Sequence, residues 1–134
     1  MIVVLDTNVV VSGMKTPAGV CAAILDEWGL GTFDVCVSAS IVEEYSDVLH
    51  RPHLKIPIEK VKALLSSIER IALIVDENSP KVGLPDPDDE IFLATALVAG
   101  AAYLVTGNLR HFPPRLCTGV RVVAPAEFLR LLNA

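Results

Sequence analysis

The sequence predicts an α/β protein in which helices cover both faces of a central parallel sheet. Three observations support this prediction. Short apolar segments alternate with longer segments of helical spacing, hydrophobic residues make up 52% of the chain, and aromatic residues make up only 5%. The 134 residues suffice for one domain with its own core, and they show no repeat or linker. We therefore expect a single three-layer α/β/α domain spanning residues 1–134.

Five short apolar segments are expected to form the strands. The first is apolar at every position, as in a strand that is buried on both faces. Strands that alternate with helices along the chain favour right-handed crossovers and a parallel sheet. The five segments are residues 2–5, 35–37, 71–75, 102–105 and 121–123.

The first two helices have recognisable ends. One is predicted from Pro17 to Trp28, because proline is tolerated in the first turn and glycines follow its end. Ser38 or Ser40 can cap the next helix, which runs toward His50 and is ended by the proline at position 52.

The second half of the chain contains three more helical segments. Apolar residues at helical spacing predict an amphipathic helix over residues 58–68. Residues 76–87 are polar and rich in proline, which favours a loop. Residues 88–99 are apolar nearly all round and predict a buried helix, and residues 125–132 predict a last helix.

The overall charge and the cysteines exclude some classes of protein. A formal net charge of −5 argues against a protein that coats nucleic acid over its whole surface, but not against one that holds RNA locally. No apolar run approaches the roughly 20 residues of a membrane span, and no signal peptide is recognisable, so we expect a cytoplasmic protein. The odd number of cysteines without a CxxC pair predicts core thiols, namely Cys21, Cys36 and Cys117.

Two segments carry clustered positive charge. For each of them, an ordinary solvated surface is the alternative to a role in binding. They are residues 51–62, with Arg51, His53, Lys55, Lys60 and Lys62, and residues 110–121, with Arg110, His111, Arg115 and Arg121.

Asp6 follows the first strand directly. In open α/β sheets, ligands bind at the edge where the strands end, and a carboxylate at that edge is suited to a hard cation such as Mg²⁺. The alternative is that Asp6, Thr7 and Asn8 form a turn in which the side chains bond to local backbone groups.

Four further acidic residues can converge on this edge. Glu43 and Glu44 lie in the helix after the second strand, and Asp88 and Asp89 open the apolar helix. Each pair taken alone is explained by capping or by a solvated helix surface. Together with Asp6, however, they would repel one another unless a cation is bound. Because no cluster of histidines or cysteines competes, Mg²⁺ or Mn²⁺ is favoured over Zn²⁺.

Four segments of the chain resemble PIN domains, the ribonuclease fold of the VapC-type toxins of bacterial and archaeal toxin-antitoxin pairs. The segments occur in the same order as in that family and together span nearly the whole chain. They are Ile-Val-Val-Leu-Asp-Thr-Asn at 2–8, Ser-Ala-Ser-Ile-Val-Glu-Glu-Tyr-Ser-Asp-Val-Leu-His-Arg-Pro at 38–52, Pro-Asp-Pro-Asp-Asp-Glu-Ile-Phe-Leu-Ala-Thr-Ala at 85–96 and Tyr-Leu-Val-Thr-Gly-Asn-Leu-Arg-His-Phe at 103–112.

The resemblance implies a carboxylate site made of Asp6, Glu44 and Asp89, with Thr106 and Asn108 completing the edge. Many members of the family have a fourth aspartate where this chain has Asn108. A second metal ion would therefore be held less firmly here.

The resemblance also favours one member of each acidic pair. Glu44 is preferred to Glu43 because the family's glutamate stands five residues before the leucine that is Leu49 here. Asp89 is preferred because the family's aspartate directly precedes the Xaa-Ile-Phe-Leu-Ala run, and Asp88 remains a helper.

The function expected from these residues is metal-dependent hydrolysis of RNA phosphodiester bonds. Asp6 and Asp89 would hold a Mg²⁺ that orients a water molecule, and Glu44 would complete the ligand set or take the proton of that water. Thr7 or Ser12 would bond the scissile phosphate, although such hydroxyl groups are more often local caps. Cleavage that leaves a 5′-phosphate and a 3′-hydroxyl is what the resemblance implies.

The resemblance implies two protein partners, a small antitoxin and a second copy of the chain. The mean hydropathy of +0.53 supports such partners, because it suggests more apolar surface than one small core hides.

Two alternatives to the ribonuclease remain open. One is a PIN-like module that has lost activity, which Asn108 favours. The other is a phosphoacceptor receiver domain. Such a domain needs an acidic pair after the first strand and a lysine late in the chain, and this chain has neither.

Overall fold

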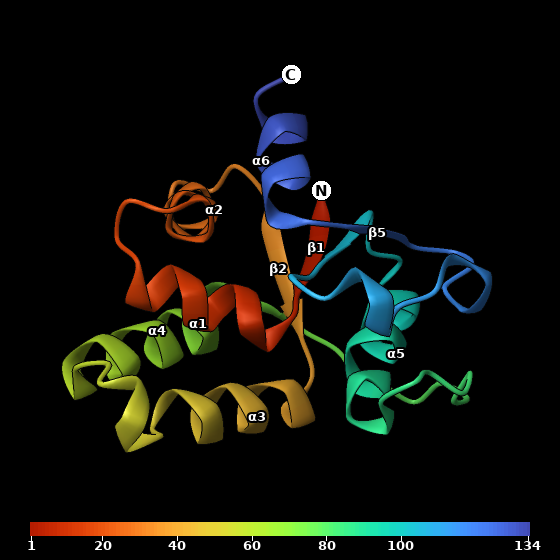
Figure 1. The fold of residues 1–134 in the computed structure, drawn as a ribbon, viewed down its shortest axis with the longest axis horizontal. Helices are drawn as coiled ribbons and strands as arrows, with labels where there is room; N and C mark the ends of the chain where they lie inside the picture. Colours follow the sequence, from red (N-terminus) through yellow and green to blue (C-terminus); the bar gives the residue numbers. More distant parts are fainter.

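The computed structural model describes residues 1–134 and contains one sheet of five parallel strands (Figure 1). The strand order is β3-β2-β1-β4-β5, so the first strand lies at the centre and the chain crosses the sheet between β3 and β4. The predicted parallel sheet is confirmed. The strands are β1 (Ile2–Leu5), β2 (Asp34–Val37), β3 (Leu73–Ile74), β4 (Tyr103–Val105) and β5 (Arg121–Val123).

Helices cover both faces of this sheet. Helix α5 packs on β1, β2 and β4, and Figure 1 shows it on the opposite side of the sheet from α1 and α2. Helix α2 contacts α1 and α6, and helix α3 contacts α1 and α4. The sheet is therefore the middle layer of three, as predicted. The helices are α1 (Thr7–Lys15), α2 (Val20–Gly29), α3 (Ala39–Leu49), α4 (Ile58–Ile71), α5 (Glu90–Ala99) and α6 (Pro125–Leu132).

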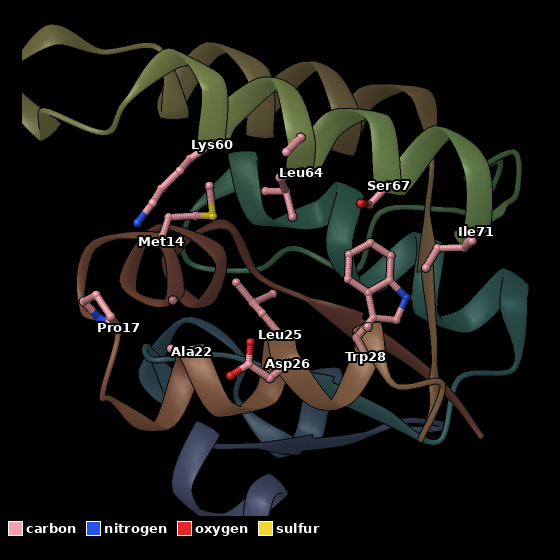
Figure 2. A pocket seen from close by; sticks show the side chains of 13 residues that line it. Met14, Pro17, Ala22, Leu25, Asp26, Trp28, Lys60, Leu64, Ser67 and Ile71 are labelled. Carbon is pink, nitrogen blue, oxygen red and sulfur yellow. The ribbon is translucent and has the colours of Figure 1, made fainter.

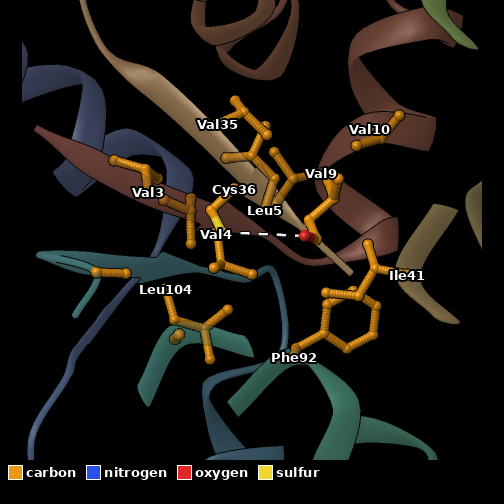
Figure 3. Packing of buried hydrophobic residues seen from close by; sticks show 14 of the residues in the cluster. Val3, Val4, Leu5, Val9, Val10, Val35, Cys36, Ile41, Phe92 and Leu104 are labelled. Carbon is orange, nitrogen blue, oxygen red and sulfur yellow. Dashed lines mark hydrogen bonds between the residues drawn. The ribbon is translucent and has the colours of Figure 1, made fainter. Parts of the chain in front are cut away.

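The core is aliphatic, as the composition predicts. The residues of β1 from Val3 to Leu5 are at most 1% exposed. All three cysteines are buried and free of disulfide bonds, which confirms them as core thiols. Figure 3 shows the side chains of β1 packed among residues of the neighbouring strands and of α5, including Val35, Cys36, Leu104 and Phe92.

Helix α1 is the element that the sequence analysis did not predict. The turn-like residues 6–8 and the β-branched run 9–11 both disfavour a helix by local propensity. In the structure, Val9 and Val10 are buried in the core, and this packing outweighs the weak local preference. As a result, Asp6 is the N-cap residue of α1 rather than part of a free turn.

Other differences concern the ends of elements. Strand β3 has only two residues because Ile71 still belongs to α4. A 3₁₀ turn at Pro87–Asp89 precedes α5, and α2 begins at Val20 rather than at Pro17. No single helix is long and apolar enough to cross a membrane, although α1 and α2, bent by 98°, meet that criterion as a pair.

Candidate active site

Asp6 lies at the carboxyl end of β1 and is only 5% exposed. Its Oδ2 accepts hydrogen bonds from Thr106 Oγ1 at 2.7 Å and from Asn8 Nδ2 at 3.1 Å. The Asn8 side chain in turn accepts a bond from the backbone N–H of Gly107 at 3.0 Å. These bonds join α1 to the end of β4, so residues 6–8 do more than form a local turn. Burial raises the pKa of the Asp6 carboxyl, and these hydrogen bonds only partly offset that effect.

Glu44 is brought to the same edge by helix α3. The helix begins at Ser38, whose Oγ accepts the Ile41 N–H at 3.3 Å, and this confirms one of the two predicted caps. The buried hydroxyl of Tyr45 donates a hydrogen bond to the Leu5 carbonyl, which fixes α3 beside the end of β1.

The carboxylate of Glu44 accepts a hydrogen bond from Thr7 Oγ1. Burial raises the pKa of the Glu44 carboxyl, and the charges of Asp6 and Asp88 raise it further. Glu43, by contrast, is exposed, and no hydrogen bond joins its side chain to this edge. Glu44 is therefore the member of the pair that contacts the residues around Asp6.

Asp89 ends the 3₁₀ turn that leads into α5, and it is 9% exposed. Its Oδ2 lies 2.8 Å from Nδ1 of His111, which belongs to a second 3₁₀ turn at Leu109–His111. Burial and the negative charge of Asp6 raise the pKa of Asp89 to about 6. Asp88 is exposed, and its backbone N–H is bonded to the side chain of Asp86 at 3.0 Å.

Thr106 and Asn108 follow β4. Thr106 is fully buried, donates to Asp6 and accepts the backbone N–H of Asn108 at 3.0 Å. Asn108 is exposed, and its side chain does not cap the turn that follows. Ser12 is also exposed. It lies six residues along α1 from Asp6, which is about 9 Å at the usual helical rise, so it is separated from the carboxylates along the helix axis.

Two residues of this edge were missed by the sequence analysis. The ligand atoms of Asp86, Asp89 and His111 all lie within 4.8 Å of one another. Asp86 stands in a proline-rich loop, where aspartate usually serves a turn, and His111 belongs to one of the basic segments. The signal that could have found His111 is its position three residues after Asn108, which lies at the end of β4.

The chemistry of these residues fits a divalent cation. Three carboxyl groups with raised pKa values, Asp6, Glu44 and Asp89, lie at one edge, and the charge of Asp6 raises the pKa of the other two. Of these three, only Asp89 belongs to the group whose ligand atoms lie within 4.8 Å of one another, together with Asp86 and His111. Carboxylate and amide oxygens are ligands that Mg²⁺ and Mn²⁺ prefer. A cation would remove the repulsion that now favours protonation. His111 adds one nitrogen donor that the sequence analysis did not place here.

A groove of about 810 Å³ opens beside this cluster, between α3 and the 3₁₀ turn at 87–89. Its acidic lining residues are Glu43, Glu44, Asp47 and Asp88. The groove therefore borders the carboxyl edge of the sheet, the edge at which open α/β proteins bind their ligands.

The fold and the site define the class of the protein as a three-layer α/β domain with acidic residues at the carboxyl edge of its sheet. The family model of the PIN domain matches residues 2–110. The chain therefore belongs to the PIN domain family, which is a family of nucleases.

Solved structures confirm the fold. The chain is 16% identical to VapBC2 from Rickettsia felis, crystallised with a DNA fragment from their promoter, with a TM-score of 0.62 and coverage of 92% of this chain and 98% of that one. VapBC-1 from nontypeable Haemophilus influenzae is 16% identical, with a TM-score of 0.62 and coverage of 94% of this chain and 99% of that one. FitAB bound to the IR36 DNA fragment is 20% identical, with a TM-score of 0.54 and coverage of 92% of this chain and 94% of that one. No curated protein sequence matches the chain.

Proposed function

We propose that this protein is a metal-dependent endoribonuclease of the VapC toxin type. The observation that carries the proposal is the meeting of Asp6, Glu44 and Asp89, each with a raised pKa, at the carboxyl edge of a PIN domain sheet. Such a cluster is costly to keep ionised without a cation, and phosphodiester hydrolysis is chemistry that carboxylate-bound cations support.

The chain's own residues have distinct roles in this proposal. Asp6 and Asp89 would hold Mg²⁺ or Mn²⁺, with Asn108 as a weaker oxygen ligand. When bound, the cation supplies positive charge for the phosphoryl oxygens and lowers the pKa of a water molecule. Thr106 orients the Asp6 carboxylate through its 2.7 Å hydrogen bond. Asn8 supports the Asp6 carboxylate through its 3.1 Å hydrogen bond, and Asp88 is the proposed helper.

Glu44 is the residue proposed to accept a proton. The raised pKa of its carboxyl makes it a better base toward water than a fully solvated glutamate. Its partner Thr7 holds the Glu44 carboxylate toward the site. An in-line attack by the deprotonated water would leave a 5′-phosphate and a 3′-hydroxyl on the cleaved RNA.

A small antitoxin protein is the proposed partner. The related solved structures are of VapBC and FitAB, named as pairs. Figure 2 shows a groove of about 400 Å³ between α4 and the pair α1 and α2, into which Met14, Leu25, Trp28 and Leu64 project. A peptide-like segment with apolar side chains would be complementary to this groove.

A homodimer is proposed on the exposed apolar residues near the edge of the sheet. Ile71, Leu73 and Ile74 are 48%, 41% and 63% exposed, and β3 is an edge strand. Exposed apolar groups at a strand edge favour association with another chain. A cytoplasmic location stays a prediction.

The alternative function is a PIN module without activity. Asn108, which replaces an aspartate common in the family, favours it. Membership of the PIN family argues against the receiver-like alternative.

A nuclease assay separates the proposal from the inactive module. The purified protein is incubated with labelled RNA in Mg²⁺, in Mn²⁺ and in EDTA, and an identically purified Asp6→Asn variant controls for contaminating nucleases. We expect cleavage that needs the metal ion and the wild-type Asp6. Cleavage that persists in EDTA, or that the variant retains in full, would contradict the mechanism.

A further inference from the structure

Positive and negative charges are segregated between two segments that border the candidate site. Residues 91–126 contain three arginines but no aspartate, glutamate or lysine. This segment includes the turn at 109–111 and the connection from β4 to β5. A different charge pattern is found at α3 and the turn at 87–89, where four acidic residues line the groove of about 810 Å³. An acidic groove and a segment without carboxylates therefore both border the candidate site, and the two turns touch where His111 bonds Asp89.

Two arginines of this segment are free to bind an external anion. Arg110 and Arg115 are exposed, and the ion pairs of the structure involve neither of them. The third, Arg121, lies 3.7 Å from Glu127 and packs over the ring of Tyr103.

Arg110 lies in the chain between two residues that are hydrogen-bonded to the candidate site. Its neighbour His111 bonds Asp89 at 2.8 Å, and Asn108, two residues before it, bonds Thr106. Between them, Leu109 is 49% exposed and presents an apolar surface at the same turn. Arg115 follows His111 by four residues, so their Cα atoms are at most about 15 Å apart.

We propose that the RNA strand reaches the site over the basic rim, defined as Leu109, Arg110 and Arg115, and not through the acidic groove. This inference rests on the proposed ribonuclease function and adds the path of the substrate. The guanidinium groups of Arg110 and Arg115 contact phosphates next to the scissile bond, and Leu109 packs against a base. Phosphate binding by arginine is favoured by its planar, bidentate geometry. The carboxylates of the groove repel a polyanion, so they disfavour a path of the strand through the groove.

The other basic segment is a weaker candidate. Residues 43–62 contain four basic residues, Arg51, Lys55, Lys60 and Lys62, and four acidic ones, Glu43, Glu44, Asp47 and Glu59, so their formal charges cancel. Moreover, Arg51 is paired with Asp47 at 3.3 Å.

The test is the salt dependence of RNA binding, measured in EDTA so that no cleavage occurs. The probe is a short fluorescein-labelled single-stranded RNA, and its affinity is followed by fluorescence anisotropy as the salt concentration rises. The Arg110→Ala/Arg115→Ala double variant is compared with the matched double variant Lys60→Ala/Lys62→Ala, which loses the same formal charge from exposed positions of α4. The Arg110→Lys/Arg115→Lys variant serves as a charge-conserving rescue.

Each phosphate contact on a single strand contributes about 0.7 to the slope of log K against log salt concentration. The Arg110→Ala/Arg115→Ala variant should therefore lose about 1.4 from the magnitude of this slope, whereas the Lys60→Ala/Lys62→Ala control keeps the wild-type slope. The Arg110→Lys/Arg115→Lys variant should recover most of the lost slope. If the arginine variant kept the full slope, or the Lys60/Lys62 variant lost it instead, the proposed path would be overturned. These outcomes leave the ribonuclease function intact, because cleavage by the wild type is measured separately in Mg²⁺.

Discussion

Asp89 and Glu90 are neighbours in the sequence and are both buried, yet the protein treats their charges in opposite ways. Glu90 accepts three hydrogen bonds, at 2.7 to 3.0 Å, from the backbone N–H groups of residues 82–84. Burial alone would raise the pKa of Glu90, but these donors hold it below its usual range. For Asp89, burial and the charge of Asp6 raise the pKa to about 6, and the bond to His111 does not compensate.

The difference separates a structural carboxylate from the proposed metal ligands. The charge of Glu90 is satisfied by the protein, and its role is to hold the loop that precedes α5. The charges of Asp6, Glu44 and Asp89 are satisfied only in part, and this incomplete compensation is what a bound cation would remove.

The largest effect is expected on catalysis. Asp6→Asn, Glu44→Gln and Asp89→Asn should each lower the rate of RNA cleavage at least about a hundredfold, because each removes a charge from the site. The matched substitutions Glu43→Gln and Asp88→Asn, one residue away from Glu44 and Asp89, should have much smaller effects. Single-turnover cleavage assays measure the rates. Equal losses within a matched pair would show that the ligands are wrongly assigned.

A large effect on stability is expected at Glu90 instead. Glu90→Ala should lower the free energy of unfolding by about 2 kcal/mol, because it leaves the N–H groups of residues 82–84, of which Leu84 is buried, without their acceptor. Asp89→Asn should leave the stability unchanged or raise it, since it removes an uncompensated charge. Urea denaturation without metal compares the two variants, and a greater loss of stability in Asp89→Asn would reverse the contrast.

The pH dependence of the metal-free protein should reveal Asp89. Its pKa is raised from 3.8 to about 6, so the folded state binds more protons than the unfolded state between these values. The stability that this group contributes is therefore present at low pH and lost as the pH rises through about 6. Thermal unfolding between these pH values should show a weaker decline in Asp89→Asn. An identical decline in both proteins would mean that Asp89 is not the titrating group.

The smallest effect is expected at Asn108. Its amide offers an oxygen but no charge, so Asn108→Ala should reduce cleavage far less than Asp6→Ala does. Asn108→Asp should lower the metal concentration needed for half-maximal cleavage. If Asn108→Ala reduced cleavage as much as Asp6→Ala does, the site would be built around different ligands.

The sequence predicted the sheet and the layers because each depends on a local pattern, whereas the assignment of the three carboxylates to a metal site stays a prediction. The apolar run before Asp6 predicts a buried strand, and the segments around Glu44 and Asp89 carry family motifs. Helix α1 could not be predicted, because the burial of Val9 and Val10 is a property of the tertiary packing. The contact between His111 and Asp89 joins residues 22 positions apart in two separate turns, and no local pattern specifies it.

Direct metal binding tests the central claim that Asp6, Glu44 and Asp89 form a cation site. Calorimetric titration with Mn²⁺ at neutral pH, without RNA, compares the wild type with Asp6→Asn and with the control Glu43→Gln. The wild type and Glu43→Gln should bind the ion with similar affinity, whereas Asp6→Asn should bind it far more weakly. Equal binding by Asp6→Asn and the wild type, or no binding by the folded wild type, would contradict the account.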